Sequence, residues 1–213
     1  GKTTFFNVLT GLYQRDGGDV LFDGQPLDLE SPYRVAEAGI ARTFQNIRLF
    51  GNMTARENVM VGRHVRTGAG VVGAVLRTRR TVEEERSIEK RALELLDYVG
   101  IGARANDPAG SLPYGDQRRL EIARAMATGA KLLLLDEPAA GITGAETDRL
   151  VELIHTINQK AAVIVVDHDM NFVRMLGGGV TVLHQGAVLM EGSADAVMNN
   201  DKVREVYIGN RAK

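Results

Sequence analysis

Cysteine is absent from this 213-residue chain, and so is any long uncharged apolar run. The lack of cysteine excludes disulfides and thiolate metal sites, which suits a reducing cytosol. The stretch GAGVVGAVL is too short to span a membrane, and MLGGGVTVLHQGAVLM is interrupted by glycines, His184 and Gln185. The formal net charge is −1, so there is no overall basic field to hold nucleic acid, although a local patch would escape this count. Any role at a membrane must therefore come through a partner.

The second half of the chain has the alternating strand and helix pattern of an α/β protein. From residue 131, the short apolar runs KLLLLDEP, AAVIVVDHD and GGVTVLHQG are separated by helical patterns. Because continuous apolar runs are typical of strands buried on both sides, we expect these three to lie in a parallel sheet. The length allows one large domain or two small lobes. We predict an α/β core of residues 1–45 and 130–213, with a helical lobe of residues 46–129.

Short local signals predict where several elements begin and end. Asp23-Gly24 suits a tight turn between VLF and PLDL, and Ser31-Pro32 starts a helix that Gly39 ends. Three capping boxes predict further helix starts: Thr54 with Glu57, Thr81 with Glu84, and Thr143 with Glu146.

Two of these helices have an apolar face. The helix after Thr81 places Ile88, Ala92, Leu95, Leu96 and Val99 on one side and stops at Gly100, and the helix after Thr143 carries Leu150, Leu153, Ile154 and Ile157. The charged runs EEE and RTRR (77–80) are typical of solvated helix surface, and we assign them no catalytic role.

The first four residues, Gly1, Lys2, Thr3 and Thr4, match the second half of a phosphate-binding loop. In such loops backbone N–H groups surround phosphate oxygens at the start of a helix, and TFFNVLTGLY has the apolar spacing of a helix through Leu12. An exposed polar tetrapeptide is the alternative. Because the chain opens inside this motif, we expect the given sequence to be a fragment that lacks the preceding strand and the first half of the loop.

Two strand ends carry chemically active groups. KLLLLDEP puts Asp136 and Glu137 at the carboxyl edge of the sheet, where α/β proteins bind ligands. Adjacent residues on extended chain point in different directions, so Asp136 can hold Mg²⁺ while Glu137 orients and deprotonates a water. His168, after the next apolar run, can donate to a terminal phosphate or hold that water. The alternatives are a polar turn closed by Pro138 and an exposed or structural histidine.

A loop and helix start supply the remaining candidates. LPYGDQRRLEIARAM runs into a helix, where Gly115 lets the backbone approach an anion near the helix N-terminus. Gln45 ends the short strand IARTFQ. An ordinary capped helix and a surface glutamine are the alternatives.

Taken in order, GKTT, the Gln45 loop, LPYGDQRR, LLLLDEP and DHD resemble the ATP-binding subunits of ABC transporters over essentially the whole chain. The segments IARTFQNIRLFGNMTARENVMVG, DEPAAG and DHDM are similar in sequence to the ATPase subunits of bacterial branched-chain amino-acid importers. The resemblance implies a P-loop NTPase fold of ABC type, with a mostly parallel sheet, a small antiparallel β part and a helical lobe, and it implies hydrolysis of ATP with Mg²⁺.

The same resemblance implies a role for each motif residue. Gly1, Lys2, Thr3 and Thr4 would bind the phosphates, and Thr3, Gln45 and Asp136 would hold or sense Mg²⁺. Glu137 would be the general base, and His168 would bridge to the γ-phosphate. Gly115 would contact the ATP of a second ATPase subunit, since in the family each ATP lies between one subunit's phosphate loop and the other's signature.

Three features depart from the family pattern. The usual L-S-G-G-Q signature reads LPYGD, so the serine hydroxyl is absent and Pro113 has no N–H to replace it. Thr143 stands where the family often has aspartate. The adenine-stacking aromatic residue would precede Gly1.

The resemblance also implies partners. These are a second ATPase subunit, membrane permease subunits and, indirectly, a substrate-binding protein, at the cytoplasmic face of the inner membrane. Ile47, Leu49, Phe50 and Met53 could accept a permease helix, or they could simply pack the helical lobe. A non-transport ATPase of the same fold and an inactive, binding-only fragment are the competing functions.

Overall fold

The computed structural model describes residues 1–64, 79–142 and 144–209. Its centre is a three-stranded parallel sheet in the order β3 (Ile40–Arg42), β4 (Leu132–Asp136), β5 (Ala162–Val166). Leu132 pairs with Ile40 on one side and Ala162 on the other, so the strands run in register and end at the same edge. The predicted α/β fold with a parallel sheet is confirmed.

The third apolar run departs from the prediction. β6 (Gly179–His184) pairs antiparallel with β7 (Ala187–Ser193) in a separate two-stranded sheet. The physical reason is the turn between them: Gln185 and Gly186 both have positive φ, 49° and 84°, which sends the chain directly back. β5 also differs from the expected fully buried strand, because its residues alternate between exposed and partly buried before Val166.

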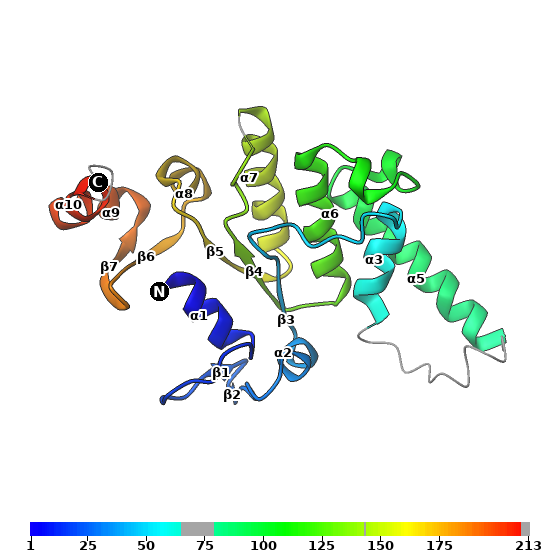
Figure 1. The fold of residues 1–213 in the computed structure, drawn as a ribbon, viewed down its shortest axis with the longest axis horizontal. Coiled ribbons are helices and arrows are strands. Elements are labelled where there is room, and N and C mark those ends of the chain that lie inside the picture. Colours follow the sequence, from blue (N-terminus) through cyan, green and yellow to red (C-terminus); the bar gives the residue numbers. More distant parts are fainter. Residues whose placement is uncertain (65–78, 143, 210–213) are drawn as a thin grey trace.

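Helices cover the sheet and extend beyond it (Figure 1). α7 (Ala145–Asn158) and α8 (Met170–Leu176) follow β4 and β5, and α9 (Ala194–Met198) and α10 (Asp201–Gly209) close the described chain beyond β7. At the opposite end of the molecule, α3 (Ala55–His64), α5 (Arg79–Tyr98) and α6 (Tyr114–Ala127) pack together with two short 3₁₀ turns, Gly102–Arg104 and Ala109–Ser111. The predicted division into lobes at residues 46 and 129 stays a prediction.

One apolar core joins the helical group to the sheet. The expected faces of α5 and α7 are buried, and they share a cluster with Leu133 and Leu135 of β4 and with Leu120 and Ile122 of α6. α3 approaches α6 so closely that a Cβ at Gly62 would lie 2.3 Å from the carbonyl oxygen of Arg124. A second, smaller cluster packs Phe6, Val35 and Ile40 under β4.

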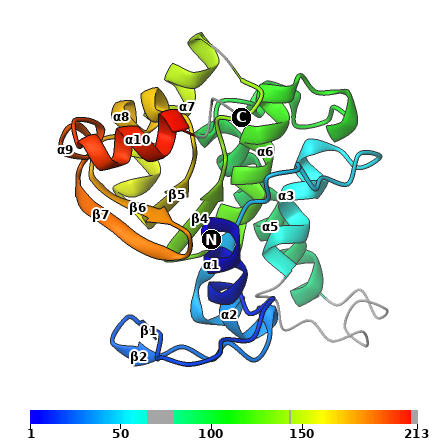
Figure 2. The ribbon, with the colours of Figure 1, turned by 60° about the vertical axis from the view of Figure 1, so that its left-hand side comes forward.

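The early hairpin and helix signals are confirmed. β1 (Leu21–Phe22) and β2 (Gln25–Pro26) pair across the Asp23-Gly24 turn, which projects from the body of the protein in Figure 2. α2 (Pro32–Ala38) is capped by the Ser31 hydroxyl, which accepts from the Arg34 N–H, and it ends at Gly39 with φ 108°. Ahead of α3, Glu57 and Thr54 exchange the two hydrogen bonds of a capping box, at 2.8 and 3.2 Å.

Two predicted helix boundaries are wrong, and a third lies outside the described residues. α1 (Lys2–Leu9) ends before Leu12, because Gly11 takes φ 68° and turns the chain, so Leu12 lies exposed outside the helix. α5 begins at Arg79, so Thr81 lies inside its first turn and does not start it; arginine is a good helix former, and the helix extends upstream through Arg79 and Arg80. Thr143, like residues 77 and 78 of RTRR, lies outside the described residues.

Within the described ranges, no helix combines the length and the apolar character needed to cross a bilayer.

Candidate functional site

Asp136 and Glu137 lie at the carboxyl end of β4, the central strand of the parallel sheet. Asp136 is the last strand residue and is almost fully buried. Glu137 leaves the strand with φ 46°, a left-handed conformation unusual for a residue with a side chain, and its N–H donates to the carbonyl of Val166 at 2.7 Å. This turn points the two carboxylates to different places. The structure therefore separates the two acids as two distinct functional groups.

The loops that follow the three parallel strands bring Gln45, Glu137 and His168 together. The Gln45 amide Nε2 donates to Glu137 Oε2 at 2.8 Å, and His168 Nδ1 lies 3.5 Å from Glu137 Oε1. Gln45 follows β3, Glu137 follows β4 and His168 follows β5, so the shared strand direction accounts for the meeting. A carboxylate between an amide and an imidazole can hold and orient a water molecule for attack.

Asp167 fixes the backbone that carries His168. Its buried carboxylate accepts from the N–H of His168 at 2.7 Å and of Asp169 at 2.9 Å, and its other oxygen accepts from the N–H of Ala139 at 3.4 Å. This contact ties the loop after β5 to the loop after β4. Sequence reasoning missed Asp167, although an aspartate just after an apolar run is a common local turn former.

Arg42 is a second residue that the sequence analysis did not single out. Its Nη2 donates to Asp136 Oδ2 at 2.7 Å, with the side chains 6% and 4% exposed. Its Nη1 donates to Asn7 Oδ1 at 2.7 Å, so Arg42 links Asp136 to α1, the helix that begins with Lys2. An arginine in the apolar stretch IAR is the signal that could have found this contact, since a buried cation requires an anion nearby.

Lys2 and His168 line the same open cavity of about 620 Å³, whose walls also include Asp167 and residues of β6. Lys2, Thr3 and Thr4 form the first turn of α1, and Gly1 is its N-cap residue without a side-chain cap. The N–H groups of a first helical turn are available donors and attract anions. The cavity therefore joins a lysine, a helix N-terminus and the histidine that faces Glu137.

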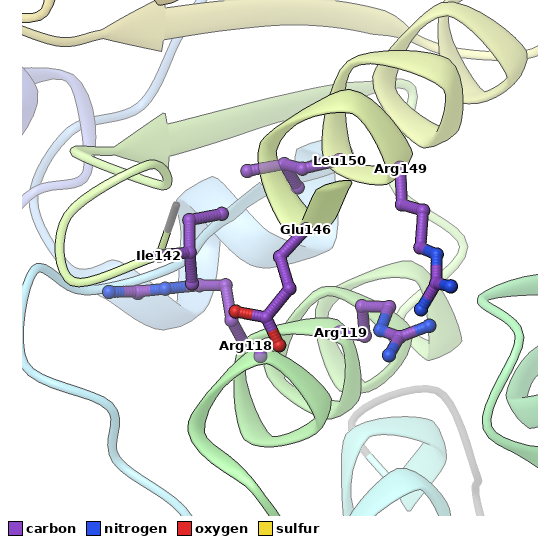
Figure 3. Close-up of a pocket in the computed structure, with 7 residues that line it drawn as sticks. Arg118, Arg119, Ile142, Glu146, Arg149 and Leu150 are labelled. Carbon is purple, nitrogen blue, oxygen red and sulfur yellow. The ribbon is translucent and has the colours of Figure 1, made fainter. Parts of the chain in front are cut away.

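Gly115 lies elsewhere, in the first turn of α6, and lines a second, small cavity with Arg119, Arg149 and Leu150. Figure 3 shows Glu146 reaching from α7 toward this turn of α6. A Cβ at Gly115 would lie 2.5 Å from Glu146 Oε1, so this carboxylate would have to shift to admit a larger residue. The structure thus does not bring Gly115 into the cluster of Gln45, Glu137 and His168.

Three of the candidate residues fit a magnesium ion by their chemistry. Asp136, Thr3 and Gln45 offer carboxylate, hydroxyl and amide oxygens, the hard ligands that Mg²⁺ prefers. Asp136 uses Oδ2 for Arg42, and Oδ1 makes no hydrogen bond to any other part of the chain that the structure describes. No cluster of three or more metal-binding acids or histidines occurs among the residues that the structure describes. Protein sites commonly hold Mg²⁺ through one or two carboxylates together with phosphate oxygens, and Asp136 offers one such carboxylate.

Together, the parallel sheet with paired acids at its carboxyl edge, the lysine at a helix start and the α6 signature define a P-loop ATPase of the ATP-binding cassette class. The chain belongs to the ABC transporter family, whose model matches residues 1–140.

Within this family, the chain is similar to ATP-binding proteins of branched-chain amino-acid transport. The chain is 40% identical to the high-affinity branched-chain amino acid transport ATP-binding protein BraF of Pseudomonas aeruginosa, over 98% of this chain and 83% of BraF. It is 39% identical to LivG of Escherichia coli K12, which bears the same description, over the same shares of the two chains. A probable LivG of Archaeoglobus fulgidus is 32% identical, over 98% of this chain and 80% of the relative.

Solved structures agree on the fold. The ADP conformation of MJ1267, an ATP-binding cassette of an ABC transporter, has a TM-score of 0.82 and 27% identity, covering 98% of this chain and 84% of that one. A dimeric post-hydrolysis state of the cassette MJ0796, bound to ADP and Pi, has a TM-score of 0.73 and 27% identity, covering 91% and 81%.

Proposed function

We propose that this chain is the ATP-hydrolysing subunit that drives import of branched-chain amino acids through membrane permease subunits. The observation that carries the hydrolytic part is the contact of Gln45 and His168 with the two oxygens of Glu137. The amino-acid part rests on the likeness to BraF and LivG, because none of the residues described at this site can select an amino acid by contact.

Each residue of the site has a role in this proposal. Glu137 accepts a proton from the attacking water, and Gln45 and His168 hold that water and the carboxylate in position. Lys2 and the N–H groups of Gly1, Thr3 and Thr4 bind the phosphates from the start of α1. Mg²⁺, held by Asp136, Thr3 and Gln45, would neutralise charge on the phosphate oxygens when bound.

A second ATPase subunit completes the site in the proposal. Because Gly115 lies outside the Glu137 cluster, we assign its helix N-terminus to a nucleotide bound by another copy or a homologous subunit. The first turn of α6 lacks a serine, and Pro113, its N-cap residue, has no N–H, so the backbone of Gly115 and the helix end must supply the contact. The pair would act on permeases at the cytoplasmic face of the membrane, with a substrate-binding protein delivering cargo to them and no nucleic acid involved.

The test compares Glu137→Gln with Glu152→Gln, a matched change on the exposed side of α7. We expect Glu137→Gln in the complete protein to bind Mg-ATP normally and to lose about 100-fold or more of its phosphate release, since a general base typically contributes 10²–10⁴-fold. Glu152→Gln should hydrolyse ATP at the normal rate. Near-normal turnover by Glu137→Gln would exclude Glu137 as the base.

A second measurement tests the cargo. Bacteria that lack their own importer ATPase receive the complete protein with its permease subunits, and uptake of labelled leucine is followed. Uptake that depends on Glu137 supports the amino-acid assignment. ATP hydrolysis without leucine uptake would reject that assignment and leave the ATPase intact.

A further inference from the structure

Helix α6 carries two charged side chains that are buried almost completely. Arg118 and Glu121 are each 1% exposed, and Arg118 Nη1 lies 2.9 Å from Glu121 Oε2. Burial raises the pKa of the Glu121 carboxyl above its ordinary value. Arg118 Nε has no hydrogen-bond partner in the part of the chain that the structure describes. Since apolar residues of similar volume commonly match or exceed the stability of such a buried pair, stability alone does not account for it.

Arg118 Nη2 also donates to the Tyr114 hydroxyl at 3.2 Å, and the remaining hydrogen bonds described here go to one segment, the backbone of Phe44 and Gln45. Arg118 donates to the carbonyl of Phe44 at 2.9 Å and to the carbonyl of Gln45 at 3.0 Å. Glu121 Oε1 accepts from the N–H of Phe44 at 3.2 Å. One helix therefore makes three hydrogen bonds to two consecutive residues more than seventy positions away in the sequence.

Two arginines contact the side chain of Phe44. The Arg48 guanidinium lies 4.5 Å from the centre of its ring, and that of Arg42 lies 5.3 Å from it. Arg42 is the residue that binds Asp136. The backbone that carries Gln45 is thus fixed between α6 and the strand end that presents the acids.

Gln45 itself is exposed and has three rotatable side-chain bonds, so its amide can reach Glu137 reproducibly only if its main chain is fixed. We propose that Arg118 and Glu121 are positioning residues that hold the backbone of Gln45 and thereby set its amide against Glu137. The role rests on the proposed function of Gln45. Because Gly115 is in the first turn of the same helix, the pair also connects the signature of one subunit to the water-orienting glutamine of that subunit.

The decisive variant replaces both members, Arg118→Met with Glu121→Leu, in the complete protein. This change removes the three bonds to Phe44 and Gln45 and takes away both charges of the pair together. Arg124, whose charge Glu121 also faces, keeps its bond to the carbonyl of Arg48, so the protein should fold. The matched control makes the same two substitutions at Arg91 and Glu94, an Arg–Glu pair with the same spacing on the exposed surface of α5.

A fluorescent probe next to Gln45 measures the mobility of this loop directly and without nucleotide. This chain has no tryptophan, so Asn46→Trp places a reporter next to Gln45. We expect the Arg118/Glu121 variant to lower the anisotropy of this tryptophan and to increase its quenching by acrylamide, and the Arg91/Glu94 control to change neither. An unchanged signal in a folded variant would overturn the proposal.

Hydrolysis tests whether the pair acts through Gln45. The double variant should lose about 10- to 100-fold in turnover, the scale expected when a catalytic group is misplaced by about 1 Å. In a Gln45→Ala background the same double variant should cause no further loss; a further loss of equal size would refute a positioning role. If Gln45→Ala alone hydrolyses ATP normally, the proposed role of Gln45 fails, while the tryptophan signal still decides whether the pair fixes the loop.

Arg118→Lys covers the case in which the double variant does not fold. Lysine keeps the charge opposite Glu121, but its single ammonium cannot reproduce the forked bonds to two carbonyls. The tryptophan should become more mobile in this variant too, and a rigid signal would contradict the proposal.

Discussion

The ion pair of Arg42 and Asp136 offers a quantitative test of how the acid is held. The two side chains are 6% and 4% exposed, and Arg42 also bonds Asn7, so Arg42→Met leaves a buried carboxylate without its partner. Breaking a buried pair in this way costs about 3–5 kcal/mol. For a chain of this size that corresponds to a fall in Tm of roughly 6–20 °C.

A double-mutant cycle separates the pair from the packing of Arg42. Asp136→Asn in the Arg42→Met background removes the unpaired charge, so it should be far less destabilising than Asp136→Asn alone, with a coupling energy of about 2–3 kcal/mol. Urea unfolding without nucleotide measures all four proteins. The matched control is Arg34→Met, whose pair with Glu37 is exposed and which should cost less than about 1 kcal/mol. Additivity within about 0.5 kcal/mol would refute the claim that Arg42 stabilises the charge of Asp136.

Three further predictions concern the scaffold. Gly62→Ala should destabilise by about 1–3 kcal/mol in chemical unfolding, because its Cβ would meet the carbonyl of Arg124 at 2.3 Å; unchanged stability would contradict this packing of α3 on α6. Gly39→Ala has room for a methyl group but must adopt φ 108°, so a cost of about 1–2 kcal/mol is expected from conformation alone, and a cost near zero would argue against this turn. Thr54→Ala should cost about 0.5–2 kcal/mol at neutral pH. Because the hydrogen bonds to Thr54 lower the pKa of Glu57 below 4.5, their contribution is present above that pH and is lost as pH falls through the folded pKa. Alanine keeps the backbone N–H that donates to Glu57, so only the bond from the Thr54 hydroxyl to Glu57 makes the effect of Thr54→Ala depend on pH. The difference between Thr54→Ala and the natural protein should therefore narrow slightly in acid, and a difference that widens in acid would contradict this bond.

The approach of Gln45, Glu137 and His168 could be predicted because each residue follows a short apolar strand. Parallel strands end at one edge, so residues just after them meet even when they are far apart in sequence. The local starts at Ser31 and Thr54 were predictable for a different reason, since caps depend on a few neighbouring residues.

The residues that sequence reasoning missed depend on distant contacts. Arg118 and Glu121 belong to QRRLE, a charged run that is typical of solvated helix surface. Their ion pair and their bonds to the distant backbone of Phe44 and Gln45 make their burial tolerable. β6 was misplaced for a similar reason, because an apolar run does not reveal which strand it will pair with. The Gln185-Gly186 turn decides that pairing, and its positive φ values were not anticipated.

Glu137 also shows how the needs of chemistry and of folding diverge at one residue. Its φ of 46° is disfavoured for glutamate and carries no steric penalty for glycine, and its backbone bond to Val166 would be kept after substitution. Thermostability screens that score only folding should therefore enrich glycine or asparagine at this position, at the expense of hydrolysis. A selection for stability and a selection for turnover applied to the same library would then move residue 137 in opposite directions.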